Sequence, residues 1–163
     1  MTRSQVREIA THISFAQNAN PRPADEVLDA LLERDYYETL GEEDELYQDY
    51  PSAKQILYLR QVAAGVSAHL AELDFYIEKY AKGWKVSRIS RVAMAIMRVS
   101  MYEVLYMPDV PGSVAINEAV EIAKHYEDAD TVSFINGILG SFIRGELRDF
   151  DETAAPKPSA EVE

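Results

Sequence analysis

Apolar residues recur at helical spacing most clearly over residues 88–140, where the pattern predicts three helices. The first segment, RISRVAMAIMRVSMYEV, is apolar on more than one side, which is typical of a helix in the middle of a bundle. The second, VPGSVAINEAVEIAKHY, is amphipathic, and the third, DTVSFINGILG, carries Gly137 and Gly140 inside an apolar run. Because glycine weakens a helix, we expect another backbone to pack close to these two residues.

Helical periodicity also covers most of the chain before residue 88. A first helix is predicted over about residues 4–18, and after a proline-rich break Pro23 can open the next helix as its first residue. The acidic segment 41–49 that follows is predicted to be a solvated loop. Ser52 and Gln55 then form a capping-box pattern at the start of a further helix, and another helical stretch covers roughly residues 67–80.

Residues suited to helix ends divide these segments. Gly83 is a suitable stop for the stretch that precedes it, and Ser87 can cap the central apolar helix. Asp130 stands where the last helix needs a cap, because a carboxylate can accept from the free N–H groups of a first turn. No segment alternates like a strand, so the prediction is an all-α fold of about seven helices.

Composition places the chain among soluble globular proteins. Of its 163 residues, 47% are hydrophobic, yet no run is long enough for a membrane span and no signal peptide is visible. There are no cysteines, which excludes disulfides and thiolate metal sites, and a cytoplasmic location is expected. Residues 151–163 are rich in Asp, Glu, Ala and Pro, and we predict a disordered acidic tail there.

Charge is unevenly distributed along the chain. The net charge is −12, whereas a protein that binds nucleic acid usually shows a basic excess, at least locally. Residues 35–49 contain seven acids and no Lys or Arg. Six of the sixteen basic residues fall within twenty positions instead: Lys79, Lys82, Lys85, Arg88, Arg91 and Arg98. Because salt screens charges beyond about 10 Å, this local excess matters more for binding a polyanion than the total does.

The C-terminal half closely resembles that of the bacterial transcription antitermination factor family NusB. The matching segments are Arg88-Ile89, Ala95-Ile96-Met97-Arg98, Tyr102-Glu103, Val110-Pro111, the run VAINEA from Val114 to Ala119, and Phe134-Ile135-Asn136-Gly137. The resemblance implies two helical subdomains, which we expect at residues 1–83 and 84–150, with the boundary near Gly83. It also implies a protein that binds boxA-type single-stranded RNA together with NusE, a protein of the small ribosomal subunit. Such a protein would act within the RNA polymerase antitermination complex during ribosomal RNA synthesis.

The resemblance places one part of an RNA site at the N-terminus. Arg3 and Arg7 lie four apart on one helix face, and Phe15 lies further along the same helix. Arginine pairs with phosphates and aromatic rings stack on unpaired bases. The alternative is a solvated helix start with Phe15 in the core. NusB-like proteins commonly carry three or more basic residues here, whereas this chain has only two, which weakens the expected affinity for RNA.

A second part is implied at the start of the last helix. Asp130 and Phe134 match positions of the family's RNA surface there, and Arg88 is expected to flank the RNA path. The alternative is that Asp130 only caps the helix and Phe134 only packs in the core. Trp84 and the ten tyrosines suggest in addition a face that binds protein.

Other functions find less support in the sequence. Glu8 with His12 and Glu121 with His125 are spaced Glu-x-x-x-His, which does not match the Glu-x-x-His of di-iron bundles, and no metal, cofactor or catalytic residue is predicted. No phosphate-binding glycine motif or nucleophile motif is present, so the protein is not expected to be an enzyme. An RNA methyltransferase would need a cofactor-binding domain for which the chain has no room. A protein-only adaptor on the same fold stays as the alternative, and both a monomer and a homodimer stay open.

Overall fold

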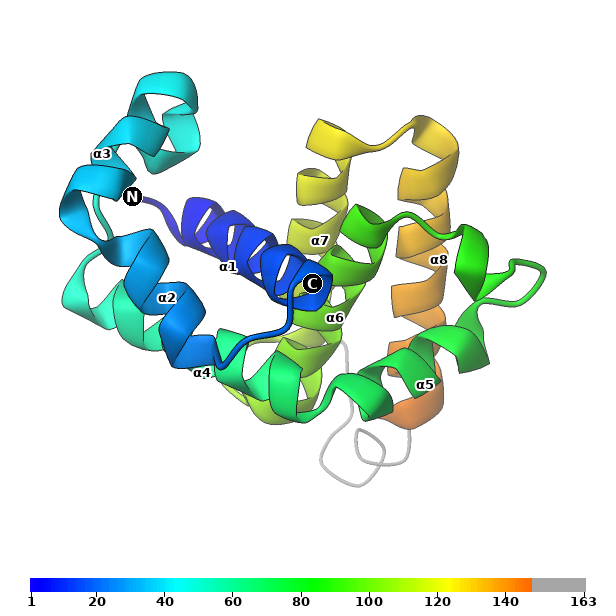
Figure 1. Ribbon diagram of the computed structural model, residues 1–163. Helices are drawn as coiled ribbons and strands as arrows, with labels where there is room; N and C mark the ends of the chain where they lie inside the picture. The colour runs from blue at the N-terminus through cyan, green and yellow to red at the C-terminus, as the bar shows by residue number, and fades with distance from the viewer. Residues whose placement is uncertain (148–163) are drawn as a thin grey trace. The chain divides into compact units, whose positions relative to one another are not determined.

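The fold is helical throughout the part of the chain that the structure describes, residues 1–147 of a computed structural model (Figure 1). It contains eight α-helices and two short 3₁₀ helices, with no strand in that range. The predicted all-α class is therefore confirmed, with one α-helix more than the seven or so expected. The predicted acidic tail at 151–163 lies outside the described residues.

The chain divides into two compact units, Met1–Ala68 and a second that begins at His69. The predicted boundary between the two subdomains was near Gly83 instead. The difference concerns helix α5 (Leu70–Tyr80), which packs against α6 (Arg91–Tyr106) and α8 (Ala129–Glu146) and so belongs with the C-terminal helices. Helical periodicity continues almost unbroken from α4 (Ala53–Ala68) into α5, which hid the division at His69.

In the first unit, α1 (Arg3–Ala19) packs against α2 (Ala24–Leu32) and α4. Thr2 caps the start of α1 in a full capping box. Its side chain accepts from the Gln5 N–H, and the Gln5 side chain accepts from the Thr2 N–H. The predicted capping box of Ser52 and Gln55 is confirmed before α4. These caps satisfy N–H groups that a helix start leaves without partners.

The acidic segment 41–49 is not the solvated loop that was predicted. Helix α3 (Arg34–Glu43) extends into it, and the 3₁₀ helix η1 (Glu45–Tyr47) follows. Leu46 and Tyr47 are buried, and the ring of Tyr37 meets that of Tyr47 edge-on with 5.5 Å between centroids. The prediction was wrong because it weighed the acids, which stay at the surface, and not the aromatic side chains that pack between them.

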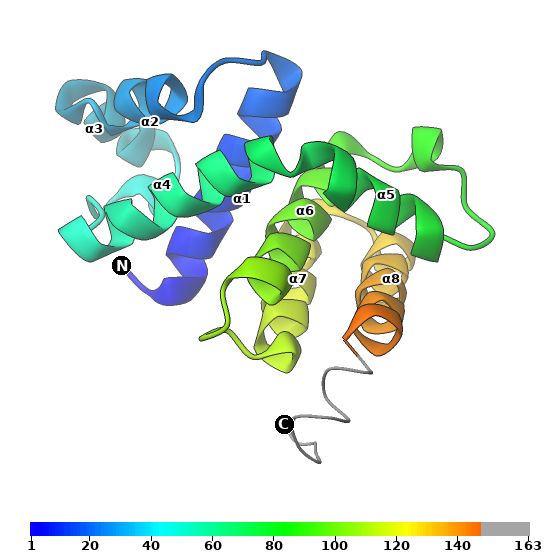
Figure 2. The same ribbon diagram turned by 90° about the horizontal axis from the view of Figure 1, so that it is seen from below.

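The second unit is built around α6, which packs against α5, α8 and α7 (Gly112–Tyr126), as Figure 2 shows from a second side. All residues from Ala93 to Glu103 are buried. This confirms the expectation of a central helix that is apolar on more than one side. Ser90 caps α6 by accepting from the Ala93 N–H at 3.0 Å, so the cap is not the predicted Ser87, which lies in the 3₁₀ helix η2 (Val86–Arg88).

Polar side chains join α5 to both α6 and α8. Arg98, 6% exposed, donates to both carboxylate oxygens of Asp74 at 2.7 and 3.0 Å. At the end of α8, Glu146 accepts from both Lys79 and Tyr80. These hydrogen bonds, together with the ion pair to Lys79, hold the pKa of Glu146 below its usual value. A Cβ at Gly145 would lie 2.1 Å from the Tyr80 hydroxyl, so glycine leaves the space that the tyrosine ring occupies here.

The close approach expected at Gly137 and Gly140 is not found. A Cβ at Gly137 would have no neighbour within 4 Å among the described residues, and at Gly140 the nearest atom is the side-chain Nη1 of Arg144 at 3.1 Å. Nothing in the structure explains Gly137. Gly83, by contrast, has φ 83°, a left-handed conformation that suits glycine in the turn after α5.

The burial of α6 gives a direct test of the core. Ile96 is 1% exposed, and we expect Ile96→Ala to lower the free energy of unfolding by about 2–5 kcal/mol, because it removes buried methyl groups and leaves a cavity. Val114→Ala on the surface of α7 is the control, since Val114 is 41% exposed and its loss should change stability little. Chemical denaturation followed by circular dichroism measures both, and equal midpoints for the two variants would contradict a core centred on α6.

Candidate nucleic-acid interface

The six residues predicted to contact RNA are divided between the two units. Arg3, Arg7 and Phe15 lie on α1 of the first unit. Arg88, Asp130 and Phe134 lie on η2 and α8 of the second. Each half presents a different chemistry, with arginine and an aromatic ring in one and an arginine, a carboxylate and an aromatic ring in the other.

On α1, the three predicted residues differ in how far they reach solvent. Arg3 is exposed in the first turn, and Phe15 is 38% exposed near the other end of the helix. The alternative that places Phe15 in the core is therefore wrong. Arg7 is only 7% exposed, so little of its side chain is open to a ligand. Arg3 and Phe15 are thus the α1 residues with surface available for a phosphate and a base.

At the start of α8, the cap is Asp128 and not Asp130. The Asp128 carboxylate accepts from the Thr131 N–H at 2.8 Å, and this hydrogen bond lowers its pKa. Asp130 lies in the first turn of α8, exposed to solvent. Within residues 1–147 its carboxylate has no hydrogen bond or ion pair, so it remains available to accept from the edge of a base.

Phe134 lies one turn further along α8 and is covered by a residue that was not in the predicted site. Its ring centroid is 4.1 Å from that of Trp84, with 40° between the ring planes. Phe134 is 9% exposed, whereas Trp84 is 48% exposed. The open aromatic surface at this place therefore belongs to Trp84. A tryptophan within a basic segment was the available sequence signal, but it was interpreted as a sign of protein binding.

The six basic residues between Lys79 and Arg98 comprise cations in ion pairs and cations exposed to solvent. Lys79 pairs with Glu146, and Arg98 pairs with Asp74, so both have a structural role. The four between them are exposed: Lys82, Lys85, Arg88 and Arg91. None of these four forms an ion pair with another residue of the described range. Arg88, at the end of η2, is thus one of a group and not a single cation.

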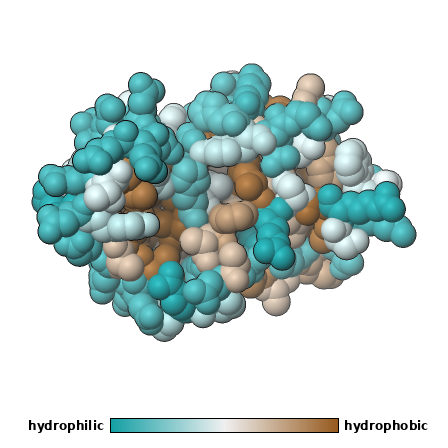
Figure 3. Space-filling view, turned by 45° about the horizontal axis from the view of Figure 1, so that its top comes forward, coloured by the Kyte–Doolittle hydropathy of each residue, from teal (hydrophilic) through white to brown (hydrophobic). Residues whose placement is uncertain are grey.

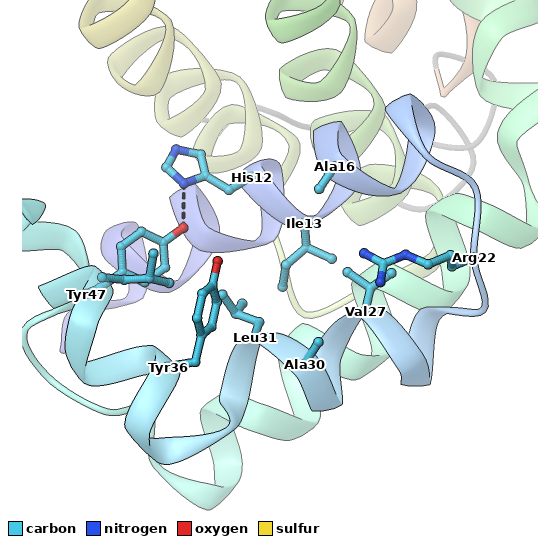
Figure 4. A pocket seen from close by; sticks show the side chains of 10 residues that line it. His12, Ile13, Ala16, Arg22, Val27, Ala30, Leu31, Tyr36 and Tyr47 are labelled. Carbon is cyan, nitrogen blue, oxygen red and sulfur yellow. Dashed lines mark hydrogen bonds between the residues drawn. The ribbon is translucent and has the colours of Figure 1, made fainter.

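The first unit also contains a pocket of about 370 Å³ (Figure 4). His12 and Tyr47 lie at one side of it and share a hydrogen bond of 2.6 Å. Burial lowers the pKa of His12 and raises that of Tyr47, which favours the neutral form of both. The Nε of Arg22, another lining residue, is buried without a hydrogen-bond partner in the described structure. Most of the other lining side chains are apolar, such as Ile13, Val27 and Leu31.

Most of the face seen in Figure 3 is hydrophilic, and hydrophobic residues show in smaller patches between polar ones. Several large hydrophobic side chains are exposed, with Phe15 and Trp84 among them. No helix among residues 1–147 is long and apolar enough to cross a membrane. No group of three or more His, Asp or Glu side chains in that range is arranged to hold a metal ion.

Comparison with known proteins identifies the fold and the family. A model of the NusB family matches residues 4–144. The chain belongs to the NusB family. The NusB structure from T. maritima superimposes with a TM-score of 0.72 at 25% identity, covering 89% of this chain and 92% of that one. The resemblance seen in the sequence is thereby confirmed.

Two relatives show how far the similarity extends. The transcription antitermination protein NusB of Symbiobacterium thermophilum is 38% identical over 146 residues, which are 89% of this chain and 91% of that protein. The protein of the same name from Acetivibrio thermocellus is 49% identical over 94 residues, 58% of this chain and 65% of the relative. Similarity to NusB proteins therefore runs through both units and is not confined to the C-terminal half.

The corrected cap of α8 predicts that two neighbouring acids differ in their effect on stability. Asp128→Ala should lower the free energy of unfolding, because it removes the acceptor for the Thr131 N–H. Asp130→Ala, with the same change in charge, should cost less, since Asp130 accepts no such bond. Thermal unfolding of both variants measures the difference. A larger loss for Asp130→Ala would restore Asp130 as the cap.

Proposed function

We propose that this protein is a transcription antitermination factor that binds boxA-type single-stranded RNA together with NusE during ribosomal RNA transcription. Membership of the NusB family carries the proposal, since its relatives bear the name transcription antitermination protein. The protein would then act as a binding component of the RNA polymerase antitermination complex and not as an enzyme.

The proposed RNA contacts follow from the chemistry of each side chain. Arg3 pairs with a phosphate, and Phe15 offers a ring on which an unpaired base can stack. In the second unit, Arg88 also pairs with phosphate, and Asp130 accepts from a base edge. Arg7 and Phe134 belong to the proposed site as well, but each is less than one-tenth exposed, so their direct contacts are expected to be smaller.

The alternative is an adaptor that binds only protein. The net charge of −12 and the burial of Arg7 favour it, because both reduce the attraction of the N-terminal segment for RNA. The two proposals agree on binding to NusE and differ on RNA. A measurement of RNA binding with and without NusE therefore decides between them.

The contact of Arg3 with phosphate can be tested by its dependence on salt. Arg3→Ala should weaken binding to boxA RNA and reduce the slope of log K against log salt by about 0.7, the effect of one lost contact on a single strand. Lys124→Ala is the control, because it removes the same charge from an exposed lysine paired with Glu121. Fluorescence anisotropy of labelled RNA over a range of salt concentrations measures both. If the two variants have the same affinity and slope, Arg3 does not contact the RNA.

NusE should raise the affinity for RNA. Alone, this acidic chain is expected to bind boxA RNA weakly, because its net charge repels a polyanion. A bound basic protein would add positive charge and a second set of RNA contacts, and two linked surfaces gain from effective concentration. We expect at least tenfold tighter binding with NusE, about 1.4 kcal/mol, and a smaller gain at high salt. To measure this, labelled boxA RNA is titrated with this protein alone, with NusE alone and with the two together. Association of the two proteins without RNA binding would support the protein-only adaptor instead.

A further inference from the structure

Trp84 is a large aromatic side chain that is half-exposed and held in place. Its 48% exposure contrasts with the 9% of Phe134, against which it packs at 4.1 Å between ring centroids. Phe134 belongs to α8, and Ile135 and Ile138 of the same helix are buried. The indole thus has a firm support on one side and remains open to solvent elsewhere.

The backbone around Trp84 forms a hydrogen-bonded turn. Gly83 takes the left-handed φ of 83° in the turn after α5, and the Trp84 N–H donates to the Ala81 carbonyl at 3.1 Å. The 3₁₀ helix η2 begins two residues later, and Ala81 is buried. A ring that is oriented before a ligand arrives loses less entropy on binding than one that must first be ordered.

Along the chain, the charged residues on both sides of Trp84 are all cations. The acids near this segment come from the start of α8, where Glu127 accepts from Ser90 and Asp130 lies one turn before Phe134. Residues 81–100 contain no Asp or Glu, and four exposed cations lie at positions 82, 85, 88 and 91, on both sides of Trp84 in sequence. In a protein of net charge −12, this is the segment that a polyanion would approach. A basic protein partner would instead be repelled by the same four charges.

We infer that Trp84, supported by Phe134, is a base-stacking residue for single-stranded RNA, and that the exposed cations of residues 82–91 hold the adjoining phosphates. The inference rests on the proposed RNA-binding function and adds a residue to that site. It also changes the role of Phe134, which supports the stacking ring more than it meets a base itself. An unpaired strand is required, because bases in a duplex have no open face to offer the indole.

The chain offers a direct probe of this inference, because Trp84 is its only tryptophan. The full chain, alone and bound to NusE, is titrated with an unlabelled boxA RNA oligonucleotide while the emission of Trp84 is followed at selective excitation. The same titrations with Trp84→Phe provide the background from NusE. Binding of a labelled RNA is measured in parallel by anisotropy. We expect saturable quenching of Trp84 at the RNA concentrations at which the anisotropy rises.

Two substitutions separate stacking from packing. Trp84→Leu keeps an apolar side chain on Phe134 but removes the aromatic face, and it should weaken RNA binding by about 5- to 150-fold. Trp84→Phe retains an aromatic face and should lose less. Both variants should bind NusE as the wild type does, and thermal unfolding shows whether each is folded. If Trp84→Leu does not fold, the quenching of the wild-type protein decides.

Each remaining outcome counts against the inference in a distinguishable way. Wild-type binding to RNA without any change in Trp84 emission, or with full affinity in Trp84→Leu, would overturn the role of Trp84 and leave the proposed function intact. A Trp84 signal that responds to NusE and not to RNA would make this surface a protein interface. Failure of the wild type to bind RNA, even with NusE, would overturn the proposed function together with the inference.

Discussion

The second unit depends on one constraint, which is that α6 has no exposed side from Ala93 to Glu103. A helix buried all round must be covered by several neighbours, and α5, α7 and α8 pack against it. Its polar side chains must then find partners within the protein, as Arg98 does in Asp74. Because these neighbours are fixed by α6, so are the start of α8 and the turn that carries Trp84. The candidate RNA surface of this unit is therefore set by its core.

Much of the fold could be predicted because helical periodicity is a local property of the sequence. The central position of α6 was evident from its apolar residues alone, and the capping box of Ser52 and Gln55 was found at the predicted residues. The other two caps were missed by a few residues. Ser87 and Ser90, or Asp128 and Asp130, are equally suitable by residue type, and only the path of the backbone decides which one meets a free N–H.

The candidate site was harder to predict than the fold, because exposure is decided by tertiary packing. Arg7 and Phe15 lie on the same helix, and nothing in their spacing indicates that the arginine is buried and the phenylalanine exposed. The contact of Trp84 with Phe134 joins residues fifty positions apart in the numbering of the chain. Neither residue alone indicates a shared surface. The two rings come into contact only when the chain folds.

The approach of Tyr80 to Gly145 has a consequence for how sequences of this fold can diverge. The tyrosine hydroxyl occupies the space that any β-carbon at position 145 would need, and Glu146 holds that hydroxyl in place. A larger residue at position 145 therefore requires the Tyr80 ring to move or to be replaced. Where a relative keeps the phenol, it should keep glycine opposite, and where it carries a smaller residue on α5, the last turn of α8 becomes free to accept side chains. Positions 80 and 145 should therefore covary among relatives. The cause would be steric and not a charge pair or a hydrogen bond between them.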